Sequence, residues 1–135
     1  MYKNILVPIS FDGERNISVP LKLTKLLAAQ GAKVTLLHVV EEIPGYVLIH
    51  IPNDYLAEKR LEIQAEIDEL SATLENAKGL VIEGHAGRTI LDWADTNKPD
   101  LIIMASHRPG MQDLLLGSTA SQVVRHAACS VHVVR

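Results

Sequence analysis

The segment Ile102–Val124, "IIMASHRPGMQDLLLGSTASQVV", joins an apolar run to a helical pattern through a polar loop. The apolar run ends at Ser106, and the helical pattern begins at Gly117-Ser118-Thr119. A helix that starts after such a loop can hold phosphate, because its free N–H groups and its dipole favour an anion. The same letters also suit a plain strand-to-helix connection, since Ser is a common N-cap. The choice between a phosphate site and a plain connection depends on the fold that the rest of the sequence predicts.

The same alternation of apolar run and helical pattern fills the chain. Apolar runs typical of strands covered on both faces occupy residues 4–9, 33–40, 80–85, 100–106 and 130–135. Helical patterns lie between them at residues 18–30, 53–77, 87–97 and 118–127. This order predicts an α/β fold, a five-stranded parallel doubly wound sheet with four helices. A length of 135 residues predicts one domain over residues 1–135.

The helical patterns predict which side chains face the sheet. The apolar positions expected to share a face are Leu23, Leu26 and Leu27 in the first helix, Leu56, Ile63, Ile67, Leu70 and Leu74 in the second, and Ala120, Val123, Val124 and Ala127 in the last. Ser118 or Thr119 is expected to cap the last helix. The irregular stretch Glu41–Asp54 is either a lid or interface element or a loop folded over the edge of the core.

Composition excludes several classes of partner. The net charge is -3 and no Lys/Arg cluster occurs, which argues against nucleic acid or an anionic membrane as the main partner. No apolar stretch approaches the roughly 20 residues that cross a bilayer, and the start does not read as a signal peptide. Cys129 is the only cysteine, which fits a reducing cytoplasm. We interpret its thiol as packed and inert rather than reactive.

Two strand ends carry the residues suited to a ligand site. Ligands of open doubly wound sheets lie outside the carboxyl ends of the strands, where the strand order reverses. "PISFDGER" follows the first strand and "ASHRPGMQDLLLGST" follows the fourth. In the latter, Arg108 offers a planar fork for phosphate oxygens, His107 a further donor, and Ser118 and Thr119 their hydroxyls.

Other motifs are missing from the chain. It has no Gly-x-Gly-x-x-Gly fingerprint, no P-loop and no Gly-x-Ser-x-Gly elbow. Its histidines do not pair at helical spacing and no Cys-x-x-Cys occurs, so no metal site is predicted. His38, inside an apolar strand, is expected to be a core histidine with its hydrogen bond satisfied.

The whole chain resembles a short single-domain bacterial universal stress protein of the nucleotide-binding type. The resemblance rests on five segments in order: "ILVPI" with an acidic loop, "LLHVV", "GHAGRTILDWA", "DLIIMASH" and "LLLGSTASQVVRHAACSVHVVR". It implies an adenine nucleotide alpha hydrolase-like sheet with strand order 3-2-1-4-5. In that order the first and fourth strand-end loops face each other across one crevice.

The resemblance also implies a site for ATP or another adenine nucleotide, accompanied by Mg²⁺. Val39 would line the adenine pocket through its backbone, with Pro8, Ile9 and Ser10 as the other wall. Met104 and Ala105 would lie under the nucleoside, and Ser10 or Asp12 would face the adenine or ribose. The residues implied at the phosphates are Ser106, His107, Arg108, Gly117, Ser118 and Thr119.

The chain departs from the family pattern at three positions. Nucleotide-binding members carry Gly-x-x-Gly, nine residues, then Gly-Ser/Thr. Here Ala105 stands at the first glycine, and the second glycine is deleted, because nine residues separate His107 from Gly117. Ser10 replaces the usual Asp after "VPI".

The function implied is that of a cytoplasmic, ATP-binding regulator in the stress response. It would form a homodimer or a tetramer through the edge strand Ser130–Arg135, because an unpaired apolar strand can pair with its copy. Two alternatives stay open: a nucleotide-free dimer of the same fold, and a slow ATPase. The second has only His107 and Asp113 near the phosphates, and they form no recognisable catalytic pair, so no catalytic residue is assigned.

Overall fold

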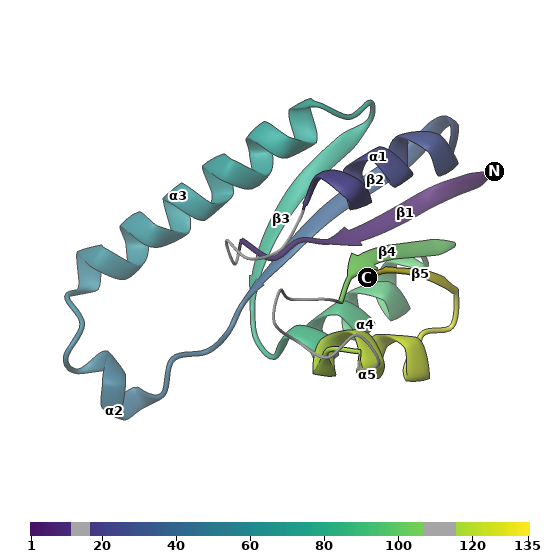
Figure 1. Cartoon of the computed structure of the whole chain (residues 1–135). Helices are drawn as coiled ribbons and strands as arrows, with labels where there is room; N and C mark the ends of the chain where they lie inside the picture. The colour runs from purple at the N-terminus through teal and green to yellow at the C-terminus, as the bar shows by residue number, and fades with distance from the viewer. Residues whose placement is uncertain (12–16, 107–115) are drawn as a thin grey trace.

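Five parallel strands form one sheet in the computed structural model, which describes residues 1–11, 17–106 and 116–135. The strands are β1 (Tyr2–Pro8), β2 (Ala28–Val40), β3 (Ala77–Glu83), β4 (Leu101–Ala105) and β5 (Ser130–Val134). Their order in the sheet is β3-β2-β1-β4-β5, and every neighbouring pair runs parallel. The expected α/β fold and strand order are therefore confirmed. The order reverses at β1, which lies between β2 and β4 (Figure 1).

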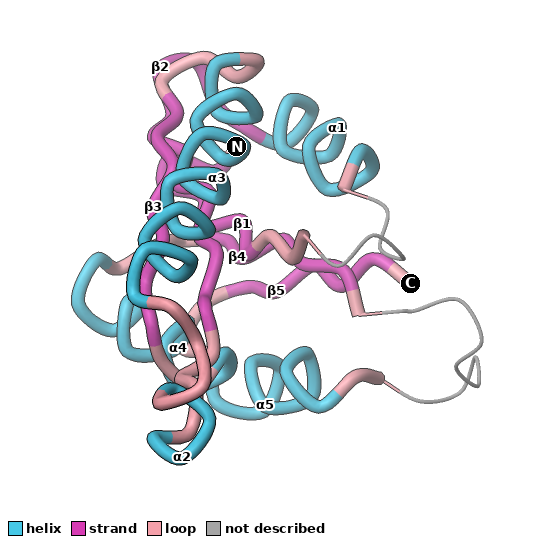
Figure 2. Tube along the Cα trace, turned by 90° about the vertical axis from the view of Figure 1, so that its left-hand side faces the viewer, coloured by secondary structure: helices cyan, strands magenta, loops and turns pink. Residues whose placement is uncertain are grey.

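Helices cover both faces of the sheet. They are α1 (Ser18–Leu27), α2 (Gly45–Leu48), α3 (Asn53–Ala72), α4 (Ala86–Asn97) and α5 (Ser118–His126). Figure 2 shows α1 and α3 on one face and α4 and α5 on the other. None of the helices in the described ranges is long and apolar enough to cross a membrane.

The core consists of two apolar layers, one on each side of the sheet. Ile5 and Val7 of β1 pack with Ile67 of α3, whereas Leu6, between them in the sequence, packs with Ile90 of α4. Successive residues of a strand point to opposite faces, so both sets of side chains are buried. This two-sided burial explains why the strand sequences are apolar without alternation.

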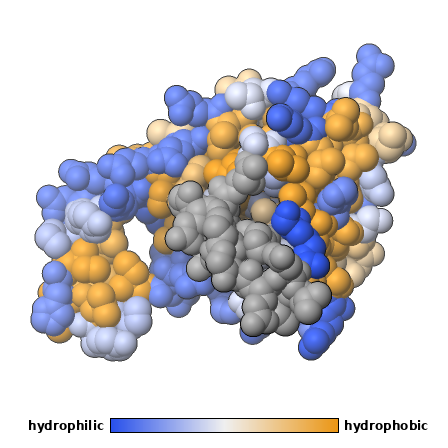
Figure 3. Space-filling view, in the orientation of Figure 1, coloured by the Kyte–Doolittle hydropathy of each residue, from blue (hydrophilic) through white to orange (hydrophobic). Residues whose placement is uncertain are grey.

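The stretch Glu41–Asp54 contains α2, one helix more among the described residues than the four expected from the sequence. No residue of α2 is buried, and Tyr46 and Ile49 are 75% and 80% exposed. The alternative of a loop folded over the core edge is therefore wrong. With the first half of α3, α2 forms an arm that projects from the body (Figure 1), and Figure 3 shows apolar surface at its end.

The side chains predicted to face the sheet from the helices are at least partly buried except at two positions, and one predicted N-cap is wrong. Leu26 is 74% exposed, because α1 turns Pro20 and Thr24 toward the sheet and Leu26 lies on the opposite side. Val124 of α5 is also exposed, beside the buried Val123. The N-cap of α5 is Gly117, and neither Ser118 nor Thr119 takes that position.

The start of β1 is fastened to the residue that precedes β4. The Asp100 carboxylate accepts the backbone N–H groups of Lys3 at 2.9 Å and Asn4 at 3.0 Å. The Asp100 N–H in turn donates to the Asn4 carbonyl at 2.9 Å. These bonds extend a ladder in which β1 pairs with β4 only through Ile5–Leu101 and Leu6–Ile102.

Candidate functional site

A pocket of ≈ 280 Å³ lies at the carboxyl edge of the sheet, where the strand order reverses at β1. Such switch points are where doubly wound sheets bind ligands. Many of the residues implied by the resemblance come together in its wall: Pro8, Ile9, Ser10, Val39, Met104, Ala105, Ser118 and Thr119. The ends of β1 and β4 and the start of α5 therefore meet at one pocket, whereas residues 107–115 of the expected fourth-strand loop lie outside the described residues.

The remaining predicted residues divide into two groups. Ser106 and Gly117 lie next to the pocket, on either side of the loop between β4 and α5. Asp12, His107 and Arg108 lie outside the described residues, as do Gly110 and Asp113.

The strands give the pocket an apolar floor with a polar rim. Side chains two apart in a strand share a face. On the face covered by α4 and α5, each of the three central strands therefore runs from a core residue through an apolar pocket residue to a polar one. These series start in the strands and end just beyond them: Leu6, Pro8 and Ser10 from β1, Leu37, Val39 and Glu41 from β2, and Ile102, Met104 and Ser106 from β4, of which Ser106 is not a lining residue of the pocket.

Ser106 carries a buried hydroxyl that lacks a partner. The residue is 3% exposed. Among the buried side-chain oxygen and nitrogen atoms of the described residues, only its Oγ has no hydrogen-bond partner. Its backbone is satisfied, because the N–H donates to the Val134 carbonyl at 3.0 Å. Buried polar atoms are nearly always hydrogen-bonded, so this hydroxyl is a candidate partner for a water molecule or a ligand group.

Gly117 brings the start of α5 close to Ser106. A Cβ added at Gly117 would lie 3.0 Å from the Ser106 carbonyl oxygen. The φ of Gly117 is -61°, so close approach, and not a left-handed backbone, explains the glycine. The first turn of α5 carries no acidic residue, which leaves the positive end of the helix dipole uncompensated by side chains there. This end of the pocket can therefore hold an anion.

Several lining residues were not predicted from the sequence. Two are polar: His38 and Glu41 of the β2 segment. Glu41 is exposed and directly follows β2, so the rule that ligands bind beyond the carboxyl ends of strands was sufficient to find it. The apolar residues are Ile17, Pro20, Leu37, Ala86 and Ile90, which come from helices α1 and α4, the segment before α1, and β2.

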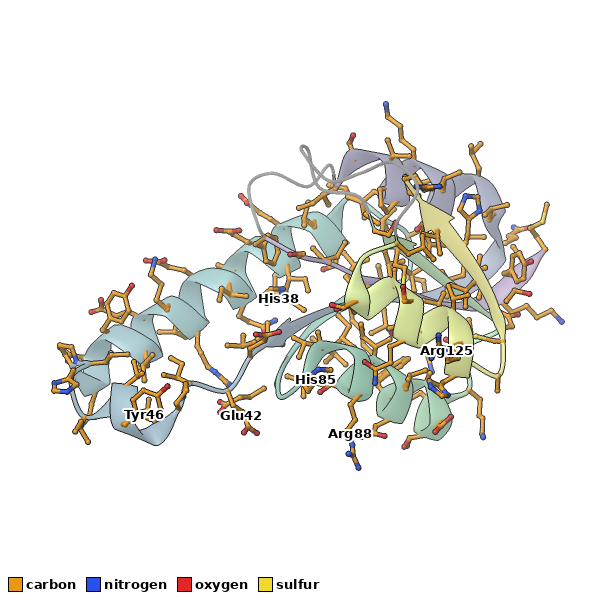
Figure 4. All side chains as sticks on the ribbon, turned by 60° about the horizontal axis from the view of Figure 1, so that its bottom comes forward. His38, Glu42, Tyr46, His85, Arg88 and Arg125 are labelled. Atoms are coloured by element: carbon orange, nitrogen blue, oxygen red, sulfur yellow. The ribbon has the colours of Figure 1, made fainter. Side chains whose placement is uncertain are left out.

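His38 was expected to be a satisfied core histidine, and its hydrogen bond is present. Its Nδ1 lies 2.8 Å from the Ile9 carbonyl oxygen. The ring also lines the pocket. Figure 4 places His38 in the body of the molecule, far from Tyr46 at the end of the arm. The same view shows His85 at the start of α4, where its Nδ1 accepts the Arg88 N–H at 3.4 Å.

Cys129 lies outside this pocket and is half-buried. Burial raises the pKa of its thiol above the ordinary value, and the negative charge of Asp100 adds to that rise. A raised pKa lowers the fraction of thiolate, the reactive form. This supports the interpretation of Cys129 as a packed thiol of low reactivity.

Comparisons with known proteins match the whole chain. A family model described as "Universal stress protein family" covers residues 1–135. Universal stress protein A homolog 2 of Coxiella burnetii is 32% identical, with 99% of this chain and 95% of that protein aligned. Among solved structures, universal stress protein UspA from Lactobacillus plantarum is 28% identical, with a TM-score of 0.72 over 99% of this chain and 98% of that one. A hypothetical protein whose biochemical function was assigned from its structure reaches a TM-score of 0.80 at 28% identity, over 99% and 96%.

More distant structures of the same fold contain adenine nucleotides. A universal stress protein in complex with cAMP has a TM-score of 0.68 at 18% identity. One from Archaeoglobus fulgidus contains dAMP, and a family protein from Arabidopsis thaliana contains AMP. At these identities the likeness to the present chain is one of fold.

Proposed function

Because the chain belongs to the universal stress protein family, we propose that it binds ATP or another adenine nucleotide in the pocket at the carboxyl edge of the sheet. The observation that carries this proposal is the buried Oγ of Ser106, which has no partner among the described residues, in a residue whose carbonyl oxygen lies against the start of α5. A hydroxyl and a helix N-terminus side by side are suited to phosphate oxygens. The nucleotides contained in distant members of the fold support the same ligand class.

The pocket has a place for each part of such a ligand. Val39 and Met104 form an apolar floor for the base, and Pro8 and Ile9 form the wall beside it. Ser118 and Thr119 lie at the phosphate end. The proposed site also includes three residues that lie outside the described ranges: Asp12, His107 and Arg108.

The proposed Mg²⁺ would be held mainly by the nucleotide. In the described part of the chain, no three His, Cys, Asp or Glu side chains lie close enough together to hold a metal. Mg²⁺ commonly binds through substrate phosphates and water with few protein ligands, so this arrangement fits an ion that arrives with the triphosphate.

We further propose a cytoplasmic homo-oligomer whose state responds to nucleotide occupancy. β5 forms one edge of the sheet and pairs with β4 alone among the strands described, so its outer side is available to Ser130–Arg135 of a second copy. A ligand shifts such an equilibrium only if it binds the two states unequally. Gel filtration with and without nucleotide therefore tests this part separately from binding.

Titration of the purified protein with Mg-ATP and with AMP in a calorimeter is expected to give saturable binding of both. Phosphate release is expected to stay at the level of a protein-free control, because no catalytic residue is assigned among the described residues that line the pocket. Absence of heat and of any thermal shift at millimolar concentrations of both nucleotides would favour the nucleotide-free dimer. Steady phosphate release would favour the slow ATPase.

Ser106→Ala is expected to weaken nucleotide binding by about tenfold, the usual effect of one hydrogen bond. It should leave the protein at least as stable in urea, because it removes a buried hydroxyl that has no partner among the described residues. Ser71→Ala is the matched control, since Ser71 is also buried but its Oγ donates to the Asp68 carbonyl at 2.9 Å, on α3. That variant should lose stability and keep its affinity. The reverse pattern would remove Ser106 from the site.

A further inference from the structure

The chain leaves β1 through Ile9, whose two backbone polar groups are both held by β2. The Ile9 N–H donates to the Leu37 carbonyl at 2.8 Å, which continues the sheet ladder by one residue. The Ile9 carbonyl lies 2.8 Å from Nδ1 of His38. The next aromatic side chain, Phe11, packs against the same imidazole, with ring centroids 5.0 Å apart and planes at 57°. One histidine thus contacts both ends of the segment Ile9–Phe11.

The hydrogen bond determines where the ring proton lies. A carbonyl oxygen only accepts, so Nδ1 must carry the hydrogen. The neutral ring is therefore the Nδ1–H tautomer, and its Nε2 is an acceptor. Protonation of the ring adds a hydrogen at Nε2 and leaves the Nδ1–H donor in place. The contact to Ile9 is consequently available in both charge states.

We propose that His38 is a positioning residue that holds the segment Ile9–Phe11 as a preformed wall of the nucleotide pocket. Ile9, Ser10 and His38 all line that pocket, so a displaced wall changes its shape. A wall that is ordered before the ligand arrives lowers the entropic cost of binding. The part of this inference that concerns affinity rests on the proposed function, whereas the part that concerns the wall does not.

Three variants separate the two ring nitrogens. His38→Asn places an amide N–H donor at the δ position, where Nδ1 lies, whereas His38→Gln places it at the ε position. His38→Leu offers no donor. For AMP binding measured by calorimetry, we expect Asn to stay within about threefold of the native protein and Gln and Leu to lose about tenfold, the effect of one hydrogen bond.

A second measurement uses the ligand-free protein. Proton–nitrogen NMR should detect the His38 hydrogen on Nδ1. Hydrogen exchange of the Ile9 amide should be about tenfold faster in the Gln and Leu variants than in the native protein and the Asn variant, because the wall opens more often.

The outcomes are distinguishable. Retention of affinity by Gln but not by Asn would show that His38 acts on the ligand through Nε2, which would overturn the inference. A hydrogen on Nε2 alone, or equal exchange of Ile9 in all four proteins, would overturn it as well. Failure of the native protein to bind any nucleotide would instead reject the proposed function, and the NMR and exchange results would still decide whether His38 holds the wall.

Discussion

Replacing Ile67 by alanine is expected to lower the free energy of unfolding by about 2–5 kcal/mol, the usual range for emptying a buried aliphatic site. Ile67 is fully buried, and Ser71, at 8% exposed, is the other buried residue of α3. The helix therefore depends on this side chain for its attachment to the sheet. Leu61→Ala is the control, because Leu61 is an aliphatic residue of the same helix that points to solvent. Urea denaturation should show little change for that variant.

The partner of Ile67 across the interface is Gly79 of β3. A Cβ at Gly79 would lie 2.8 Å from Ile67 Cγ2 and 3.2 Å from its backbone carbon. Gly79→Ala should therefore destabilise the native protein by about 1–3 kcal/mol through overpacking. In the Ile67→Ala background the Cγ atoms are gone, so the same change should cost less, giving a favourable coupling in a double-mutant cycle. Gly45→Ala is the control, since its Cβ would meet nothing within 4 Å. Strict additivity would show that α3 does not rest on β3 in this way.

Gly117→Val is expected to abolish measurable nucleotide binding, a loss of more than about a hundredfold in affinity, since it combines the loss of close packing with obstruction of the phosphate end. The Cβ alone would lie 3.0 Å from the Ser106 carbonyl, so the start of α5 has to move away from β4. That movement displaces the first turn of α5, with Ser118 and Thr119, from its place in the pocket wall.

The control for this variant is the same substitution at Gly45, at the start of α2 on the projecting arm. Gly45→Val should bind like the native protein. Circular dichroism should show that both variants are folded, because Gly117 has an ordinary φ that valine can adopt. Native affinity in Gly117→Val would place the nucleotide elsewhere on the molecule.

Strand positions were predictable because burial on both faces leaves an unbroken apolar run, as in Asn4–Ile9 and Asp100–Ser106. The buried faces of the helices were harder to predict, since apolar periodicity does not determine which of two adjacent residues points toward the sheet. Leu26 and Leu27 are adjacent in α1, and only the packed structure turned Thr24 inward and Leu26 outward. The helix α2 could not be foreseen, because a single turn without a buried residue has no periodic pattern.

The walls of the candidate site were predictable where the strand end itself forms them, as with Ser10 and Met104. His38 was interpreted only as a core residue, because it stands inside the apolar run of residues 33–40. The pocket extends around the end of the sheet, so residues of both faces line it. Whether the pocket reaches the second face of the sheet depends on where α1 begins. The sequence of β2 alone does not determine that position.

The pairing of Asp100 with Lys3 and Asn4 determines when, during synthesis, the sheet can form between β1 and β4. The partners Asn4 and Asp100 are 96 residues apart, so β1 leaves the ribosome well before β4, the strand with which it pairs, has been made. Parallel pairings across such a separation form slowly, because a long loop must close before any contact rewards it. A nascent chain that ends before β4 therefore has β1 with one edge unpaired, and its pocket lacks Met104, Ala105, Ser118 and Thr119. The residues that line the pocket are all present only once the chain has been made as far as Thr119, and until β4 has formed the unpaired edge of β1 is open to other chains.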